Sequence, residues 1–98
     1  MKSTFQEVFG SSNTIKLLDF LLDNEVYDYS MSDIARRAEI SWTSFTQLWP
    51  RFVEQGLVIQ TRTVGPAKLY MLNKKSPVVK QLLRLDWELS KQATKSLV

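Results

Sequence analysis

The stretch that decides the fold covers residues 30–58 and reads SMSDIARRAEISWTSFTQLWPRFVEQGLV. Ser30 and Ser41 are residue types that cap helix N-termini, and each precedes a run of apolar residues at helical spacing. A glycine commonly closes a helix from the position just past its end, and Gly56 follows the second run. We therefore predict a short helix over about residues 31–37 and a second helix between Ser41 and Gly56. Two helices joined by so short a turn cross steeply, which lets the second project from the body of the domain.

A core helix precedes this stretch and a β-hairpin follows it. Between residues 14 and 24, isoleucine and leucines recur at helical spacing, which predicts an amphipathic helix with its apolar side in the core. A loop through residues 27 and 28 then leads to the decisive stretch. Residues 57–72 contain two runs rich in β-branched or alternating apolar residues, and Gly65 and Pro66 between them form a turn signal. We predict two antiparallel strands that meet at this turn.

The final segment predicts a long helix with more apolar surface than one small domain needs to cover. Ser76 can cap its N-terminus, Pro77 fits the first helical position, and the pattern continues to about Ser96. Apolar residues lie on more than one side of this helix, so packing against a second copy of the chain is a natural outcome. The alternative is that the helix folds back over the first helix of its own chain. For a homodimer, we expect interface contacts from Val79, Leu82, Leu85 and Leu89.

Together these elements predict a mainly α protein with a small β-hairpin, in the α+β class. Residues 8–72 resemble the winged helix-turn-helix domains of the multiple-antibiotic-resistance and arsenical-resistance repressor types. The matching motifs are VFGSSNTIKLLDFLL for the first core helix, YSMSDIARRAEIS for the helix and turn, WTSFTQLWPRFVEQGLVIQ for the recognition helix and strand, and TRTVGPAKLYML for the wing. The resemblance implies a three-helix core with a wing, and we expect this DNA-binding domain over residues 1–75. The excess apolar surface of the last helix predicts a C-terminal dimerisation helix over residues 76–98.

The resemblance also implies how such a chain works, as a homodimeric transcriptional regulator that binds double-stranded DNA with sequence selectivity. The recognition helix would enter the major groove, with Phe45, Trp49 and Phe52 on its inner side. The residues implied to read bases are Trp42, Thr43, Ser44, Thr46 and Gln47. Phosphate contacts would come from Arg36, Arg37 and Arg51, and wing contacts from Arg62 and Lys68.

Two features depart from the pattern of such recognition helices. Residues 40–50 carry no charge, which lowers the expectation of strong guanine readout. Pro50 lies inside the predicted helix and removes one backbone hydrogen bond, so we expect it to bend or break the helix near Thr46. The uncharged helix, together with Trp42 and Trp87, leaves open a different class of function, a winged-helix module for protein–protein interaction.

Composition restricts the classes of function. The chain has 98 residues, enough for one compact domain, and it contains neither cysteine nor histidine. The usual thiolate and imidazole ligands of metals and the commonest general base are therefore missing. We expect no metal site, no cofactor and no enzymatic activity. The net charge of +3 is uneven, because residues 1–30 carry −3, residues 31–75 carry +4 and residues 76–98 carry +2. A basic middle favours contact with a polyanion.

The sequence also supports expectations about where in the cell the protein lies and about its role on DNA. No apolar run approaches the ~18 residues that a membrane span requires. The N-terminus lacks the pattern of a signal peptide. We expect a cytoplasmic protein with no membrane partner. A DNA-coating or plasmid-partition protein of the same fold is the alternative to a regulator.

Overall fold

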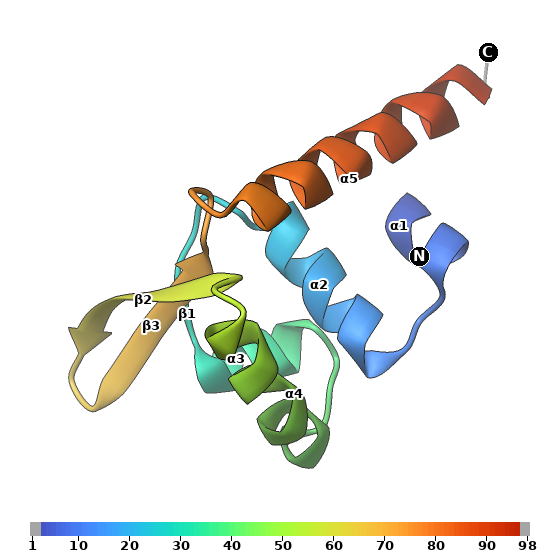
Figure 1. The fold of residues 1–98 in the computed structure, drawn as a ribbon. Coiled ribbons are helices and arrows are strands. Elements are labelled where there is room, and N and C mark those ends of the chain that lie inside the picture. Colours follow the sequence, from blue (N-terminus) through green and yellow to red (C-terminus); the bar gives the residue numbers. More distant parts are fainter. Residues whose placement is uncertain (1–2, 97–98) are drawn as a thin grey trace.

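The computed structural model describes the backbone of residues 3–96 and the side chains of residues 3–94. Within this range the chain forms five α-helices and three β-strands, and the long last helix crosses the body above the first two (Figure 1). The elements are α1 (Thr4–Phe9), α2 (Asn13–Asp23), β1 (Tyr29–Ser30), α3 (Met31–Arg37), α4 (Trp42–Glu54), β2 (Val58–Val64), β3 (Ala67–Leu72) and α5 (Pro77–Ser96). This is the winged helix-turn-helix architecture that the sequence predicted.

The helix-turn-helix motif begins and ends where the sequence predicted. The Ser30 and Ser41 hydroxyls each accept a hydrogen bond, 3.2 Å long, from the backbone amide three residues further on. In the turn between α3 and α4, Glu39 has a φ of 62°, in the left-handed region. Gly56, with a φ of 69°, follows α4 in the conformation that a glycine adopts readily after a helix. The caps therefore confirm both predicted helices.

The recognition helix α4 continues through Pro50, so the predicted break near Thr46 is wrong. Its 13 residues run from Trp42 to Glu54 without interruption. Pro50 lacks the amide that would bond to the carbonyl of Thr46, but both residues are exposed. Water can therefore satisfy the freed carbonyl. The helix keeps its full length because the missing bond lies on the solvent side.

The three strands form an antiparallel sheet in the order β1-β3-β2. The predicted hairpin is β2 and β3, and their register shifts between Gln60 and Arg62 at an irregularity in β2. The strand β1 lies just after the predicted loop, and it pairs Tyr29 with Tyr70 of β3. A strand of two residues is too short to show a periodic pattern, so it could not be predicted from local spacing. Its pairing holds the start of α3 against the wing.

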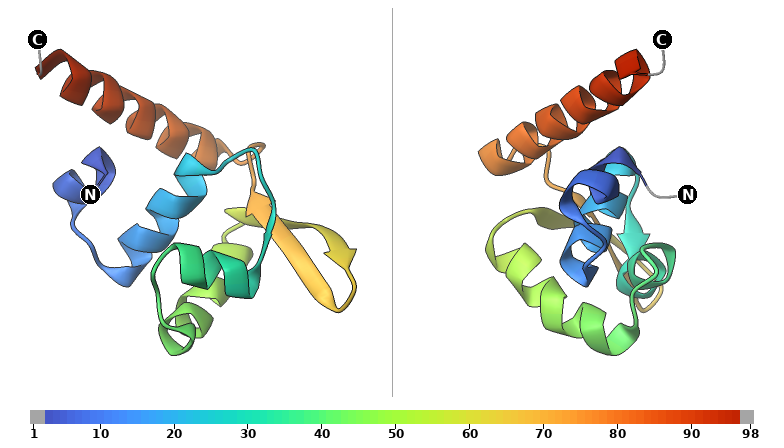
Figure 2. Two further views of the ribbon diagram at one scale, coloured as in Figure 1. Left: turned by 180° about the vertical axis from the view of Figure 1, so that it is seen from behind. Right: turned by 90° about the vertical axis from the view of Figure 1, so that its right-hand side faces the viewer.

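One hydrophobic core joins all five helices and the sheet, which Figure 2 shows from two further sides. The largest fully buried side chains come from five different elements. They are Phe45, Leu17, Ile34, Leu72 and Val79. The first turn of α5 therefore shares the core of the elements that precede it.

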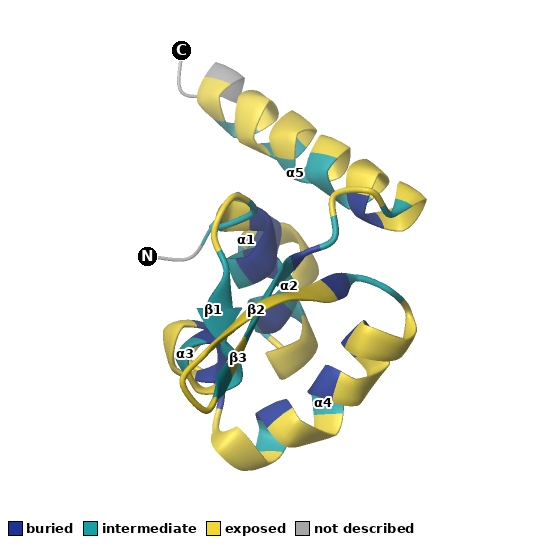
Figure 3. Ribbon diagram, turned by 90° about the vertical axis from the view of Figure 1, so that its left-hand side faces the viewer, coloured by how far each residue is buried: buried dark blue, intermediate teal, exposed yellow. Residues whose placement is uncertain are grey.

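This packing corrects one predicted dimer contact. Val79 is 0% exposed, and no surface of its side chain remains for a partner. Leu82 and Leu89 are partly buried and pack against the same core. Of the four predicted interface residues, only Leu85 is exposed, at 39%. The inner side of α5 thus covers its own chain, while its outer side stays open (Figure 3).

Candidate nucleic-acid interface

The outer side of α4 gathers three of the five residues predicted to read bases. Thr43, Thr46 and Gln47 are exposed, and their spacing places them on one side of the helix. The exposed parts of α4 are yellow in Figure 3. Trp42 is also exposed, but it lies in the same row as the inner aromatic residues. Ser44 differs, because it is half-buried. Its amide donates to the Ser41 hydroxyl, and its own hydroxyl accepts a bond from that hydroxyl at 3.1 Å. Ser44 therefore belongs to the N-terminal cap of α4 rather than to its open face.

The inner side of α4 is a ladder of aromatic rings. The Trp42 and Phe45 ring centroids lie 5.5 Å apart, and those of Phe45 and Trp49 lie 5.0 Å apart. Phe45 is 1% exposed, and Trp49 and Phe52 are also buried, as predicted. Trp42 is 53% exposed and ends the ladder. One face of its ring rests on Phe45, while the rest is free to meet a ligand.

The three arginines predicted to contact phosphates have different surroundings. Arg36 is exposed and pairs with Asp33 at 2.7 Å. Arg37 places its guanidinium carbon 5.1 Å from the ring centroid of Tyr29 and lines a hollow beside α2. Arg51 is exposed in the last turn of α4. All three side chains are accessible, but Arg37 is held beside Tyr29 rather than next to the open side of α4.

At the wing, Arg62 is engaged within the chain. Its Nε donates to Oδ2 of Asp28 at 3.0 Å, and its Nη2 donates to Oδ1 at 3.2 Å. The Thr61 hydroxyl donates to Oδ2 of the same carboxylate at 2.6 Å. The hydrogen bonds from Arg62, and to a lesser degree the hydrogen bond from Thr61, hold the pKa of Asp28 below its ordinary value. The sequence predicted Arg62 as a free wing contact and missed Asp28, because the two residues lie 34 positions apart.

A shallow groove joins the recognition helix to the wing. Trp42 and Met31 line one side of it, and Pro66 and Lys68 line the other. Lys68 is exposed, in the strand that leaves the wing turn. The structure therefore makes one continuous surface out of the two projections that the sequence predicted separately.

The flanks of α5 carry a second kind of exposed surface. Val78, Leu85 and Trp87 are large apolar residues that remain exposed on α5, and helical spacing places Val78 and Leu85 on one flank and Trp87 on the opposite flank. The Lys91 ammonium lies 5.9 Å from the ring centroid of Trp87. Of these three residues, only Leu85 was predicted as an interface contact. The prediction included Val79, which is buried, and did not include Val78 or Trp87.

A cluster of three carboxylates at the junction of α2 and α5 was missed by the sequence reasoning. Asp19, Asp23 and Asp86 approach one another there. Partial desolvation raises the pKa of Asp23 to about 6, and the neighbouring Asp19 and Asp86 add to the rise. Desolvation also raises the pKa of Asp86. The available signal was the spacing of Asp19 and Asp23, four residues apart on one helix face, and an aspartate within the apolar stripe of α5.

Comparisons with known proteins support the fold. No family model matches the chain, and no curated protein matches it. Solved structures of ZitR from Lactococcus lactis do match. A mutant in apo form has a TM-score of 0.64 and 21% identity, over 93% of this chain and 70% of that one.

A second ZitR mutant has a TM-score of 0.62 and 19% identity, over 84% of this chain and 57% of that one. A mutant of ZitR in complex with DNA has a TM-score of 0.59 and 20% identity over the same shares. The chain thus spans little more than half the length of several chains that it matches. The likeness at this identity is one of fold.

Over residues 3–96, no helix combines the length and the apolar character that crossing a membrane requires.

Proposed function

We propose that the chain binds double-stranded DNA with sequence selectivity, as a homodimeric transcriptional regulator in the cytoplasm. The observation that carries the proposal is the two-sided character of α4. Its inner side anchors it through buried aromatic rings, while its outer side is polar, exposed and continuous with the groove of the wing. A helix held in this way fits the major groove of B-DNA. The solved DNA complex of the structurally similar ZitR supports the same reading.

In this proposal, the outer side of α4 reads bases without using charge. The Gln47 amide can pair with both N6 and N7 of an adenine, and the methyl groups of Thr43 and Thr46 can contact a thymine methyl. Trp42 adds apolar surface at the start of the helix. An uncharged side with these groups favours sites rich in A·T pairs over sites that need bidentate guanine contacts.

Basic residues around α4 would position the duplex. Arg36 is exposed in the last turn of α3 and Arg51 in the last turn of α4, and both would contact phosphates. Lys68 would contact the adjacent phosphates from the wing. Arg62 would contribute more weakly, because Asp28 already neutralises its guanidinium. Arg37 would need to leave Tyr29 in order to reach a phosphate.

The exposed apolar residues of α5 support a homodimer. Val78 and Leu85, seven residues apart on one flank of the helix, would bury their side chains against a second copy. A two-fold dimer would present two α4 helices to half-sites about one helical turn apart, roughly 34 Å, on one side of the duplex. A palindromic target site follows from this symmetry.

Fluorescence anisotropy with labelled random duplex DNA at about 50 mM salt tests the proposal, since counterion release makes even non-specific contacts visible there. Binding is expected, and selection of bound fragments should enrich a palindrome. On that site, Gln47→Ala should weaken binding by about tenfold or more, the value of a bidentate base contact. Val26→Ala is the control, because Val26 is exposed in the loop between α2 and β1, outside α4, the wing and α5. Absence of binding to any duplex would contradict the proposal.

Two other readings make different predictions in the same experiments. A DNA-coating or partition protein would give a footprint that spreads with concentration instead of a bounded palindrome. A protein-interaction module is favoured by one observation, the exposed Trp42 on an uncharged helix. Such a module would show no duplex binding even at low salt.

A further inference from the structure

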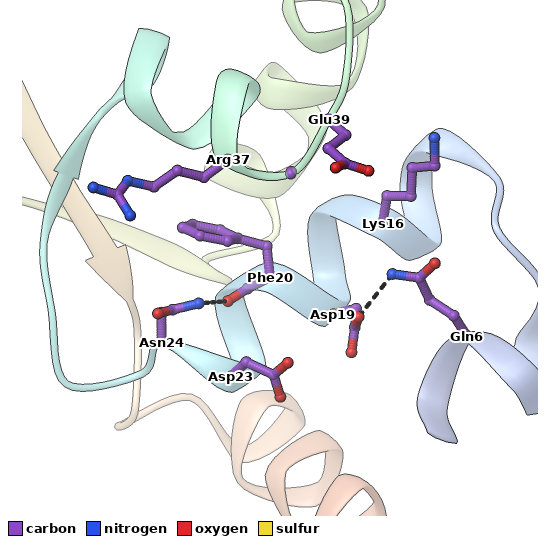
Figure 4. Close-up of a pocket in the computed structure, with 9 residues that line it drawn as sticks. Gln6, Lys16, Asp19, Phe20, Asp23, Asn24, Arg37 and Glu39 are labelled. Carbon is purple, nitrogen blue, oxygen red and sulfur yellow. Dashed lines mark hydrogen bonds between the residues drawn. The ribbon is translucent and has the colours of Figure 1, made fainter. Parts of the chain in front are cut away.

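Three carboxylates meet where α5 crosses α2. Asp19 and Asp23 lie one turn apart on α2, and Asp86 comes from α5. One oxygen of each lies within 4.8 Å of the others. Among the side chains of residues 3–94, no Lys or Arg nitrogen lies within 4.0 Å of these carboxylates. Lys16 is nearby on α2, but its side chain points away from them (Figure 4).

One oxygen at the centre of this cluster is buried without a partner. Asp19 is only 5% exposed. Its Oδ2 accepts hydrogen bonds from the Ser3 hydroxyl and the Gln6 amide, both at 2.8 Å. Its Oδ1 is buried and has no hydrogen-bond partner. In Figure 4 the oxygen that is not bonded to Gln6 points toward Asp23. Buried polar atoms are nearly always paired, so this oxygen indicates a missing ligand.

We propose that Asp19, Asp23 and Asp86 bind one hard divalent cation of the size of Ca²⁺. All three side chains offer oxygen, the donor that such ions prefer, and the sequence contains neither histidine nor cysteine, the usual ligands of softer metals. Two oxygens bound to one Ca²⁺ can lie up to about 5 Å apart, whereas Mg²⁺ restricts them to about 4.2 Å. The three oxygens lie within 4.8 Å of one another, a spacing that one ion of the size of Ca²⁺ can span. Water would complete the coordination, since Asp23 is exposed and open to solvent.

The charges around the cluster favour a cation and disfavour the empty state. Desolvation and mutual repulsion raise the pKa of both Asp23 and Asp86, and Glu25 adds to the repulsion at Asp86. A divalent cation turns that repulsion into attraction, because each carboxylate then faces a nearby positive charge. The ion would connect α2 directly to α5 and fix the angle at which α5 leaves the body. The site departs from the expectation, drawn from the missing cysteine and histidine, that the chain binds no metal.

The test is binding of Ca²⁺ to the full chain after treatment with a chelator, without DNA, so its outcome is independent of the proposed function. Isothermal titration calorimetry should show one Ca²⁺ bound per chain, and the thermal midpoint should rise with Ca²⁺ concentration. Mn²⁺ serves as a spectroscopic probe, because bound Mn²⁺ loses the paramagnetic resonance signal of the free ion. Asp86→Asn and Asp23→Asn should each weaken binding by about tenfold or more. Both remove repulsion in the empty cluster, so the variants should fold.

Glu54→Gln is the matched control, because it removes one negative charge from an exposed position on α4. Its affinity for Ca²⁺ should equal that of the unchanged chain. An equal loss in Glu54→Gln and Asp86→Asn would overturn the proposal, because it would reduce binding to a diffuse effect of surface charge. Absence of heat and of any thermal shift at about 5 mM Ca²⁺ would also overturn it, since even weak calcium modules bind at about 0.1–1 mM.

Discussion

The helices α4 and α5 are both amphipathic, and each buries one side in the same core, yet they leave opposite kinds of surface uncovered. The outer side of α4 presents Thr43, Thr46 and Gln47, which can donate and accept hydrogen bonds. On α5 the exposed apolar side chains are Leu85 on one flank and Trp87 on the other, and they suit an apolar partner better than a polar one.

The difference shows that amphipathic spacing alone specifies which side of a helix is buried but not what the other side binds. Exposed apolar area favours association with another protein surface, because water is released from both. Exposed uncharged polar groups suit the edges of bases, whose donors and acceptors they can match. The two helices therefore have different proposed roles, since α4 would bind DNA and α5 would bind a second copy of the chain.

The largest expected effect distinguishes the two sides of α4. Phe45→Ala should lower the free energy of unfolding by about 3–5 kcal/mol, because it leaves a cavity where a fully buried ring packs between Trp42 and Trp49. Gln47→Ala, on the exposed side of the same helix, should change it by less than about 0.5 kcal/mol. Urea unfolding followed by circular dichroism measures both. Similar losses in the two variants would contradict the two-sided arrangement of α4.

The next effect separates α4 from α5 by function. Leu85→Glu should weaken self-association by about tenfold or more, because it places a charge in an apolar interface, as measured by sedimentation equilibrium. Trp42→Ala should leave self-association unchanged and weaken binding to a selected duplex. If Leu85→Glu left the chain's oligomeric state unaltered, the proposed dimer contact through the exposed apolar residues of α5 would be wrong.

Much of this comparison could be predicted from local sequence, because local signals fix helix ends. Ser30, Ser41 and Gly56 act on their immediate neighbours, and each does in the structure what its residue type indicated. The exposed side of α4 also followed from spacing. Pro50 was misjudged because its cost depends on whether the freed carbonyl meets water, which sequence spacing does not reveal.

Contacts between segments that are distant in the chain could not be predicted from the sequence. The pairing of Asp28 with Arg62 and the approach of Asp86 to Asp19 depend on how elements that are distant in the sequence cross in space. The burial of Val79 has the same origin, since several stripes on α5 were apolar enough to face the core. The angle at which α5 crosses α2 determines which of these stripes faces the core.

A smaller effect is expected at the point where α4 ends. Gly56→Ala should cost about 1 kcal/mol of stability, because alanine is strained at a φ of 69°. No atom lies within 4 Å of the position that a Cβ would take, so the cost comes from the backbone alone. Gly56→Asn should recover part of it, since asparagine tolerates this conformation better. Urea midpoints of the two variants measure the difference, and a larger loss for asparagine than for alanine would contradict this cause.

The smallest effect concerns the wing, where the partner of Arg62 is acid-sensitive. The pKa of Asp28 is lowered in the folded chain by hydrogen bonds from Arg62 and Thr61, so the ionised carboxylate stabilises the fold above the ordinary value of 3.8. As the pH falls below that value, the unfolded chain takes up a proton first, and this part of the stability is lost. Asp28→Asn should therefore reduce the fall of the urea midpoint between about pH 5 and pH 3.

Glu54→Gln, which alters an exposed carboxyl on α4 outside the wing, should keep the full acid dependence. The effect should be small because the Arg62 side chain is largely exposed and water screens the ion pair. Salt provides a second check, since added salt should shrink the difference between Asp28→Asn and the unchanged chain. A difference that salt leaves intact would mean that Asp28 stabilises the wing mainly through its bond to the Thr61 hydroxyl.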